Sequence, residues 1–161
     1  MESTANTTDA GPNSGPDISK LLECLPESFR SAQTKITPVA AGNSGAGVYL
    51  VENAGAKSIL KVTAATESVD GWKRAVAMQS AAAELGLAPA VIYADAERRA
   101  VVSAFVTDYS FPAFFGNPVT RDNAIAALGR MVRGIHSIAP LPEHPVADPH
   151  GMLATFWSGL Q

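Results

Sequence analysis

The stretch GNSGAGVY at residues 42–49 and the run SILKV at residues 58–62 decide how this sequence is expected to fold. The first is a glycine-rich turn that leads into strand-forming residues, and the second is an apolar run that contains one lysine, Lys61. Backbone N–H groups in a glycine-rich turn can come close to phosphate oxygens because no Cβ intervenes, and a lysine on a neighbouring strand supplies a positive charge. Together the two stretches indicate a β-sheet lobe that binds a nucleotide.

Extended runs continue on both sides of these stretches and predict a five-stranded sheet. The sequence Asn53-Ala54-Gly55 is the turn signal between the second and third strands, and a charged turn at 95–99 separates the last two. The glycine-rich stretch then lies in the hairpin between the first and second strands. The expected strands are residues 36–41, 47–52, 58–63, 90–94 and 100–106.

Helices are expected before, within and after the sheet. Asp17 can cap a short helix that ends at Pro26, and a helix at 70–85 starts at Asp70 and stops at Gly86. Further helices are expected at residues 120–136 and 151–160. Apolar residues at helical spacing mark the inner faces of the first three helices: Ile18, Leu21, Leu22 and Leu25; Val76, Met78, Ala82 and Leu85; and Ile125, Leu128, Met131, Val132 and Ile135.

The composition is typical of one globular domain. With 161 residues, 47% of them hydrophobic, the chain can form one core, and its net charge of -3 gives no basic footprint for nucleic acid. No stretch approaches the roughly 20 apolar residues of a membrane helix. Residues 1–17 are polar and lack a cationic start, so a disordered arm is expected there rather than a signal peptide. The expected compartment is the cytoplasm, and the single cysteine, Cys24, is expected to be buried.

Five segments in fixed order carry a resemblance to a known family: GNSGAGVYLV, SILKV, LGLAPAVIYAD, VVSAFV and GRMVRGIHSI. Between residues 36 and 142 the chain resembles the N-terminal lobe of the aminoglycoside phosphotransferases and of their choline-kinase-like and thiamine-kinase-like relatives. The resemblance implies an α+β, protein-kinase-like fold. Residues 18–106 would form a lobe with a five-stranded antiparallel sheet and one helix, 107–118 a hinge, and 119–161 the start of an incomplete helical C-terminal lobe.

The same resemblance implies an activity and a set of ligands. Members of the family transfer the γ-phosphoryl group of ATP or GTP, with Mg²⁺, to the hydroxyl of a small molecule such as an aminoglycoside, choline or thiamine. The expected partners are therefore a nucleotide and, in a longer parent protein, a small-molecule acceptor.

The resemblance also implies roles for individual residues on the phosphate side and on the base side of the nucleotide. Lys61 would contact the α- and β-phosphates, and Ile59 would cover one face of the adenine ring. Three residues would form the loop above the β- and γ-phosphates: Ser44, Gly45 and Ala46. The backbone groups of three hinge residues would bind the edge of the base: Ser103, Ala104 and Phe105.

Two departures from the family pattern matter for chemistry. The glutamate that holds the lysine in the family aligns with Ala75, so that Glu67 or Asp70 from the preceding segment would have to replace it. The His-x-Asp motif followed by Asn, and the later metal-binding Asp, have no counterpart in the 161 residues. No catalytic or metal-binding residue is therefore assigned, and the chain is expected to be the nucleotide-binding half of a truncated enzyme, inactive alone.

Other interpretations of these residues stay open. The glycines can serve an ordinary hairpin turn, and Lys61 can be an edge-strand lysine whose stem covers apolar surface. The chain can also be a non-catalytic interaction module, or pseudokinase, that binds a protein or itself through the surface around residues 111–115 and the last helices. The aromatic residues after the sheet would either pack between lobes or line the site of an organic substrate: Phe105, Tyr109, Phe111, Phe114 and Phe115.

Overall fold

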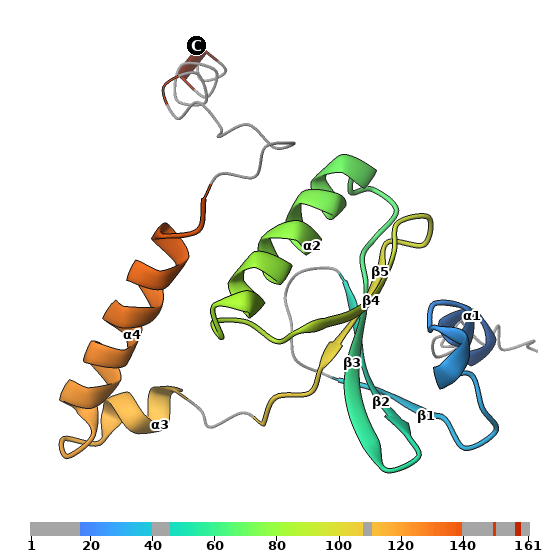
Figure 1. The fold of residues 1–161 in the computed structure, drawn as a ribbon, viewed down its shortest axis with the longest axis horizontal. Helices are drawn as coiled ribbons and strands as arrows, with labels where there is room; N and C mark the ends of the chain where they lie inside the picture. The colour runs from blue at the N-terminus through green and yellow to red at the C-terminus, as the bar shows by residue number, and fades with distance from the viewer. Residues whose placement is uncertain (1–16, 40–45, 108–110, 140–149, 151–156, 159–161) are drawn as a thin grey trace, which may run out of the picture.

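The computed structural model describes residues 17–39, 46–107, 111–139, 150 and 157–158, and its architecture is α+β (Figure 1). The five strands of its sheet are β1 Lys35–Pro38, β2 Gly47–Asn53, β3 Ala56–Val62, β4 Val91–Asp95 and β5 Ala100–Ala104. The helices are α1 Ile18–Glu23, α2 Val69–Glu84, α3 Phe111–Gly116 and α4 Arg121–His136, with one 3-10 turn at Glu27–Phe29. The expected arm at residues 1–17 falls outside the described residues, except for Asp17, and most of the expected helix at 151–160 also does.

The strands are ordered β1-β2-β3-β5-β4, and every neighbouring pair is antiparallel. This arrangement confirms the five-stranded antiparallel sheet and the α+β class. The helix α2 joins β3 to β4, because β4 lies beyond β5 at the edge of the sheet and cannot follow β3 by a tight turn. The strand expected at 100–106 ends earlier, at Ala104, since Phe105 and the residues after it leave the sheet.

One face of the sheet is buried against the N-terminal segment. Alternation along the strands directs Val51, Leu60 and Val102 to this face, where all three are fully buried. They pack with Leu21, Cys24 and Leu25 from α1 and the residues after it. Asp17 caps α1 as expected, its carboxylate accepting a hydrogen bond of 3.1 Å from the N–H of Ser19.

Cys24 is buried, as expected, and behaves as a small core residue. Its side chain is 6% exposed, and its Sγ donates a hydrogen bond of 3.3 Å to the carbonyl oxygen of Lys20. Burial raises the pKa of the Cys24 thiol, because the thiolate loses its hydration. The thiol therefore stays protonated and unreactive at neutral pH.

The other face of the sheet is covered by α2, as Figure 1 shows. The helix is capped by Ser68, whose Oγ accepts a hydrogen bond of 3.0 Å from the N–H of Gly71. The expected start at Asp70 is therefore wrong, and Asp70 lies in the first turn. The expected apolar face is also partly wrong. Met78 and Leu85 are 39% and 51% exposed, whereas Trp72 is buried.

The two hairpin turns that lie wholly within the described residues are fixed by local chemistry. In the β2–β3 turn Ala54 and Gly55 both have positive φ, 49° and 81°, which is the backbone twist of a two-residue hairpin. In the β4–β5 turn the carboxylate of Asp95 accepts hydrogen bonds from the backbone N–H and the guanidinium of Arg98, at 3.0 and 3.1 Å. Burial favours the protonated form of Asp95, but these hydrogen bonds outweigh it and lower the pKa of the carboxyl.

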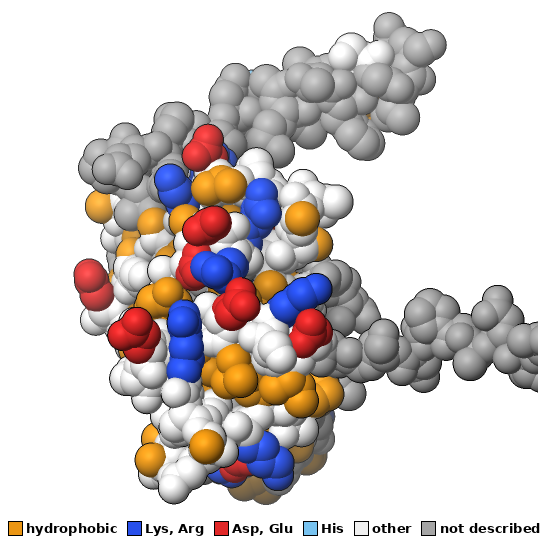
Figure 2. Space-filling view, turned by 90° about the vertical axis from the view of Figure 1, so that its right-hand side faces the viewer, with side chains coloured by type: hydrophobic (Ala, Val, Ile, Leu, Met, Phe, Trp, Pro, Cys, Tyr) orange, Lys and Arg blue, Asp and Glu red, His pale blue; other side chains and the backbone are white. Residues whose placement is uncertain are grey.

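Arg98 also connects this turn to the N-terminal segment, since its guanidinium lies 3.6 Å from the carboxylate of Glu23. Basic and acidic side chains are interspersed across the face of the molecule shown in Figure 2, with hydrophobic ones between them. That face therefore presents no broad field of one sign.

The segment after the sheet differs from expectation. The hinge expected at 107–118 contains a helix, α3, although Tyr109 lies outside the described residues. The helix α4 has the expected bounds to within one residue, but its expected inner residues are 40–50% exposed, and only Ala124 is buried, at 9%. Close contact with the rest of the molecule occurs near Gly134, where an added Cβ would lie 2.6 Å from Cδ1 of Leu87. Within the described residues, no helix has the length and apolar character needed to cross a membrane.

Candidate functional site

Lys61 lies between β3 and α2, on the side of the sheet that α2 covers. It pairs with Val48 on β2 and with Val101 on β5, so it occupies a central position in the sheet and not an edge. Its side chain lines a cavity of about 80 Å³ beside the first half of α2. The edge-strand interpretation of this lysine is therefore wrong. The residues that line the cavity are Lys61, Thr63, Glu67, Trp72, Ala75, Val76, Gln79 and Val101.

Ala75 and Glu67 line the same cavity as Lys61, whereas Asp70 does not. The helical position at which a carboxylate could face the lysine is thus occupied by Ala75, which carries only a methyl group. Among the described residues, Lys61 has no ion pair within 4.0 Å. Of the two carboxylates considered from sequence, Glu67 is the one that the fold brings to Lys61.

Glu67 belongs to the short segment before α2, and that segment is locally ordered. Its N–H donates a hydrogen bond of 3.1 Å to the carbonyl oxygen of Ala64. Its side chain lies over the first turn of α2, where an added Cβ on Gly71 would be 3.7 Å from Oε1. Gln79, the other polar residue on α2 at the cavity, donates its side-chain N–H to the carbonyl oxygen of Pro89 at 3.1 Å. The Gln79 amide is therefore engaged away from Lys61.

The glycine-rich stretch is described only at its end. Ser44 and Gly45 lie outside the described residues, while Ala46 and Gly47 lead into β2. Gly47 pairs with Val62, so the stretch lies at the end of the sheet where β3 finishes. A Cβ on Gly47 would be 2.6 Å from Oη of Tyr49, which means that the tyrosine ring occupies the space a side chain would need. Packing of Tyr49 accounts for this glycine.

The three residues expected at the hinge differ in what their backbones can bind. Ser103 sits inside β5, between Ile59 on β3 and Val91 on β4. The N–H of Ala104 donates a hydrogen bond of 2.9 Å to the carbonyl oxygen of Ala90, so this donor is occupied. Phe105 has left the sheet, and within the described part of the chain its backbone groups have no hydrogen-bond partner. Of the three residues expected at the hinge, Phe105 is the one whose main chain makes no hydrogen bond to another described residue.

Lys57 lies close to Phe105. Its Nζ is 5.7 Å from the centre of the Phe105 ring and 3.7 Å from Oε1 of Glu52. Ile59 lies between Lys57 and Lys61 on the same side of β3, and it is half-buried. The fold thus places Ile59 and Lys61 on one side of the sheet, and Lys57 on the same side reaches the ring of Phe105.

The sequence did not single out four of the residues that line the cavity: Thr63, Trp72, Gln79 and Val101. Trp72 had a detectable signal, because it precedes Val76 by four residues and so shares its side of α2. Thr63 also had one, since it follows Lys61 by two residues along an extended segment. Nothing in the sequence distinguishes Gln79 from other polar helix residues.

The described residues at the cavity offer few ligands for a magnesium ion. Glu67 is the one carboxylate among the described residues that line the cavity, so a Mg²⁺ ion held there would depend on this side chain and on the phosphates of a bound nucleotide. The described residues contain no group of three His, Cys, Asp or Glu side chains placed to hold a metal. No metal step is derived from these residues.

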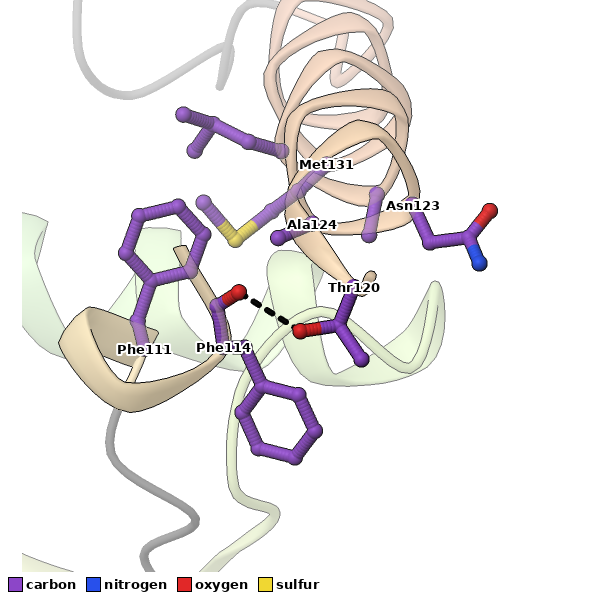
Figure 3. Close-up of a pocket in the computed structure, with 8 residues that line it drawn as sticks. Phe111, Phe114, Thr120, Asn123, Ala124 and Met131 are labelled. Carbon is purple, nitrogen blue, oxygen red and sulfur yellow. Dashed lines mark hydrogen bonds between the residues drawn. The ribbon is translucent and has the colours of Figure 1, made fainter. Parts of the chain in front are cut away.

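A second and larger cavity lies between α3 and α4 and has a volume of about 490 Å³ (Figure 3). The Met131 side chain points toward the ring of Phe111, and Asn123 projects away from the aromatic rings. Thr120 Oγ1 donates a hydrogen bond of 2.7 Å to the carbonyl oxygen of Phe114, which closes the α3–α4 corner. We call this cavity the α3–α4 groove. Its lining is Phe111, Phe114, Thr120, Asn123, Ala124, Ala127, Leu128 and Met131.

Comparison of the chain with protein families, with curated proteins and with solved structures found no match to any of them.

Proposed function

We propose that this chain binds ATP or GTP and forms the nucleotide-binding part of a phosphotransferase of the aminoglycoside phosphotransferase and choline-kinase-like class. In this proposal the five-stranded sheet and α2 form a protein-kinase-like lobe. Its main support is the position of Lys61, a lysine on a central strand whose side chain lines a cavity against the one helix of the lobe. A lysine used only to solubilise an edge strand would not occupy that position.

Each part of the nucleotide has a partner in this proposal. Lys61 holds the phosphates as a point charge, because its ammonium has no competing ion pair among the described residues. Ile59 gives an apolar surface to the base, and the main chain of Phe105 binds its edge. The segment before β2, with Ser44, Gly45 and Ala46, would cover the phosphates through its backbone N–H groups.

The proposal assigns binding, and not phosphoryl transfer, to the 161 residues. Transfer depends on metal-held phosphates and on a group that orients the acceptor hydroxyl. The cavity at Lys61 offers one carboxylate, and the sequence contains no His-x-Asp motif followed by Asn. A small-molecule acceptor would require further residues.

Isothermal titration of the chain with ATP and with GTP tests this proposal. Saturable binding is expected, and Lys61→Ala should raise the dissociation constant by about tenfold, the loss of one phosphate contact. Lys35→Ala is the matched control, since Lys35 is an exposed lysine at the start of β1. Absence of saturable heat with either nucleotide, or equal affinity of the two alanine variants, would refute the proposal.

A second candidate function is a non-catalytic interaction module. It is favoured by the exposed apolar side chains of α3 and α4, among them Phe111, Phe114 and Phe115 at 46–47% exposure. A chain that fails to bind nucleotide yet associates with itself would support this candidate.

A further inference from the structure

The cavity at Lys61 is lined by a cation and an anion that do not pair with each other. Lys61 on β3 and Glu67 before α2 both contribute to its wall. Among the described residues, neither of the two side chains forms an ion pair within 4.0 Å. Each charge is therefore available to a group of opposite sign that enters the cavity.

No other charged side chain among the described residues lines this cavity. Asp70, Lys73 and Arg74 belong to the first two turns of α2 but do not contribute to the wall. Arg99 is adjacent through its backbone, since its carbonyl oxygen accepts a hydrogen bond of 3.0 Å from the N–H of Thr63, yet it is not part of the wall either. The wall thus has one basic and one acidic side chain, which do not balance the several negative charges of a metal-free triphosphate.

The start of α2 places the carboxylate of Glu67 at this wall. The side chain lies alongside Gly71, where an added Cβ would be 3.7 Å from Oε1 and 3.9 Å from Cγ of Glu67. Gly71 precedes Ala75 by four residues, so the two share one side of α2, and Ala75 lines the cavity. The carboxylate therefore lies about one helical turn before Ala75, on the side of α2 that faces Lys61.

The size of the cavity limits what can enter it. Its volume is about 80 Å³. A water molecule takes about 30 Å³ in the liquid, so the cavity has room for about two or three waters or for a group of similar size. A phosphate group with an ion beside it is of this order, whereas a nucleoside has to lie outside.

We propose that Glu67 binds the Mg²⁺ ion that accompanies the nucleotide, while Lys61 binds the phosphates. One carboxylate together with substrate phosphates and water is a usual ligand set for Mg²⁺. The ion offsets the charge of the carboxylate and of the phosphates, which Lys61 alone does not. This role differs from that of a replacement ion-pair partner for Lys61. The inference rests on the proposed function, and it concerns binding of the nucleotide with its metal and not phosphoryl transfer.

Isothermal titration with ATP in MgCl₂ and in EDTA, at equal ionic strength, tests the role of Glu67. For the wild-type chain Mg²⁺ should lower the dissociation constant of ATP by about tenfold. Glu67→Gln keeps the size of the side chain and removes its charge, so the two buffers should then give the same dissociation constant. Asp70→Asn is the matched control, because Asp70 does not line the cavity, and it should keep the tenfold difference.

The results separate this inference from the proposed function. ATP binding in neither buffer would refute nucleotide binding, and the inference with it. ATP binding that Lys61→Ala weakens but Mg²⁺ does not change would leave the proposed function standing and refute the role of Glu67. A Glu67→Gln variant whose dissociation constant shifts equally in both buffers would overturn the inference too, since it would make Glu67 the partner of Lys61.

A second measurement places the ion without relying on affinity. Mn²⁺ can replace Mg²⁺, and because it is paramagnetic it broadens the NMR signals of nearby amides. In the presence of ATP the amides of residues 67–71 should lose intensity, whereas those of Ala54 and Gly55, at the opposite end of β3, should not. Glu67→Gln should remove this broadening at saturating ATP. Equal broadening in the variant and the wild type, or none in the wild type, would contradict the proposal.

Discussion

At the scale of single residues, Ala75 leaves the ammonium group of Lys61 without a fixed carboxylate. Glu67 lines the same cavity but belongs to the segment before α2, and it forms no ion pair with Lys61 within 4.0 Å. An ion pair between Lys61 and Glu67 would require ordering of the segment before α2, which costs conformational entropy. A carboxylate on the packed helix would not incur this backbone cost, because the helix is already ordered. The position of the Lys61 charge therefore depends on what else enters the cavity.

Replacing Ala75 with glutamate should give Lys61 a carboxylate that is carried by the helix. Alanine and glutamate both favour helices, so the change costs α2 little, and an exposed ion pair contributes about 0.5 kcal/mol to the free energy of unfolding. A double-mutant cycle with Ala75→Glu and Lys61→Met, measured by urea denaturation at low salt, gives the interaction free energy between Glu at position 75 and Lys61. Ala75→Gln is the uncharged control. Zero coupling at low salt would show that the two positions do not interact.

At the scale of elements, the start of α2 determines which side chains line the cavity, because Glu67 directly precedes the cap residue, Ser68. Oγ of Ser68 accepts a hydrogen bond from the N–H of Gly71. This bond fixes the start of α2 at Val69, the residue after Ser68. Asp70 adds only a charge in the first turn. The cap hydrogen bond therefore places the start of α2 two residues after Glu67 and three residues before Trp72.

Ser68→Ala should lower the free energy of unfolding by about 1 kcal/mol, because the N–H of Gly71 loses its acceptor. Ser68→Asp keeps an acceptor and should retain most of the stability. Asp70→Ala should cost less, about 0.5 kcal/mol, since it removes only the interaction with the helix dipole. Chemical denaturation of the three variants measures these differences, and a larger loss for Asp70→Ala than for Ser68→Ala would contradict the assigned cap.

Local patterns in the sequence were enough to predict the elements of the sheet and α1. Alternation of side chains and the turn residues Ala54 and Gly55 act within a few positions of each other, so the strands and the β2–β3 hairpin could be anticipated. The helix in the expected connector was missed because Phe111–Gly116 has only six residues, which is too short to show a helical period of apolar and polar side chains.

The candidate site was predictable only in part. The run around Lys61 indicated a strand with a functional lysine, but the neighbours of that lysine come from α2 and β5, and their identity depends on packing. The amphipathic pattern of α4 predicted an apolar side but not whether another element of this chain packs against it. Residues on that side, such as Ile125 and Ile135, are exposed. For Gly47, the pattern suggested phosphate binding, whereas its neighbour Tyr49 gives a packing reason.

At the scale of the whole molecule, burial is unevenly distributed. Fully buried side chains gather between the sheet and α1, including Leu25, Val51, Leu60 and Val102, whereas the described part of α3 and α4 has one buried residue, Ala124. Because hydrophobic burial is the main source of stability, the α3–α4 unit should open more readily than the sheet.

Hydrogen exchange followed by mass spectrometry tests this difference. Amides of α4 should exchange faster than those of β3 and β5, which form the centre of the sheet. Val132→Glu, which changes an exposed apolar residue of α4, should leave the exchange of β3 and β5 unchanged. Equal protection of α4 and the central strands would mean that the molecule unfolds as one unit.

The placement of Trp72 has an optical consequence. The chain has two tryptophans, and Trp72 is 4% exposed in the cavity with Lys61, while Trp157 is 69% exposed. An indole shielded from water emits at shorter wavelength than a hydrated one, so the two contributions separate in the fluorescence spectrum. With Trp157 replaced by Phe, the remaining emission comes from the wall of the lysine cavity itself. The protein thus carries an intrinsic fluorophore at the position where a ligand of Lys61 would change its surroundings.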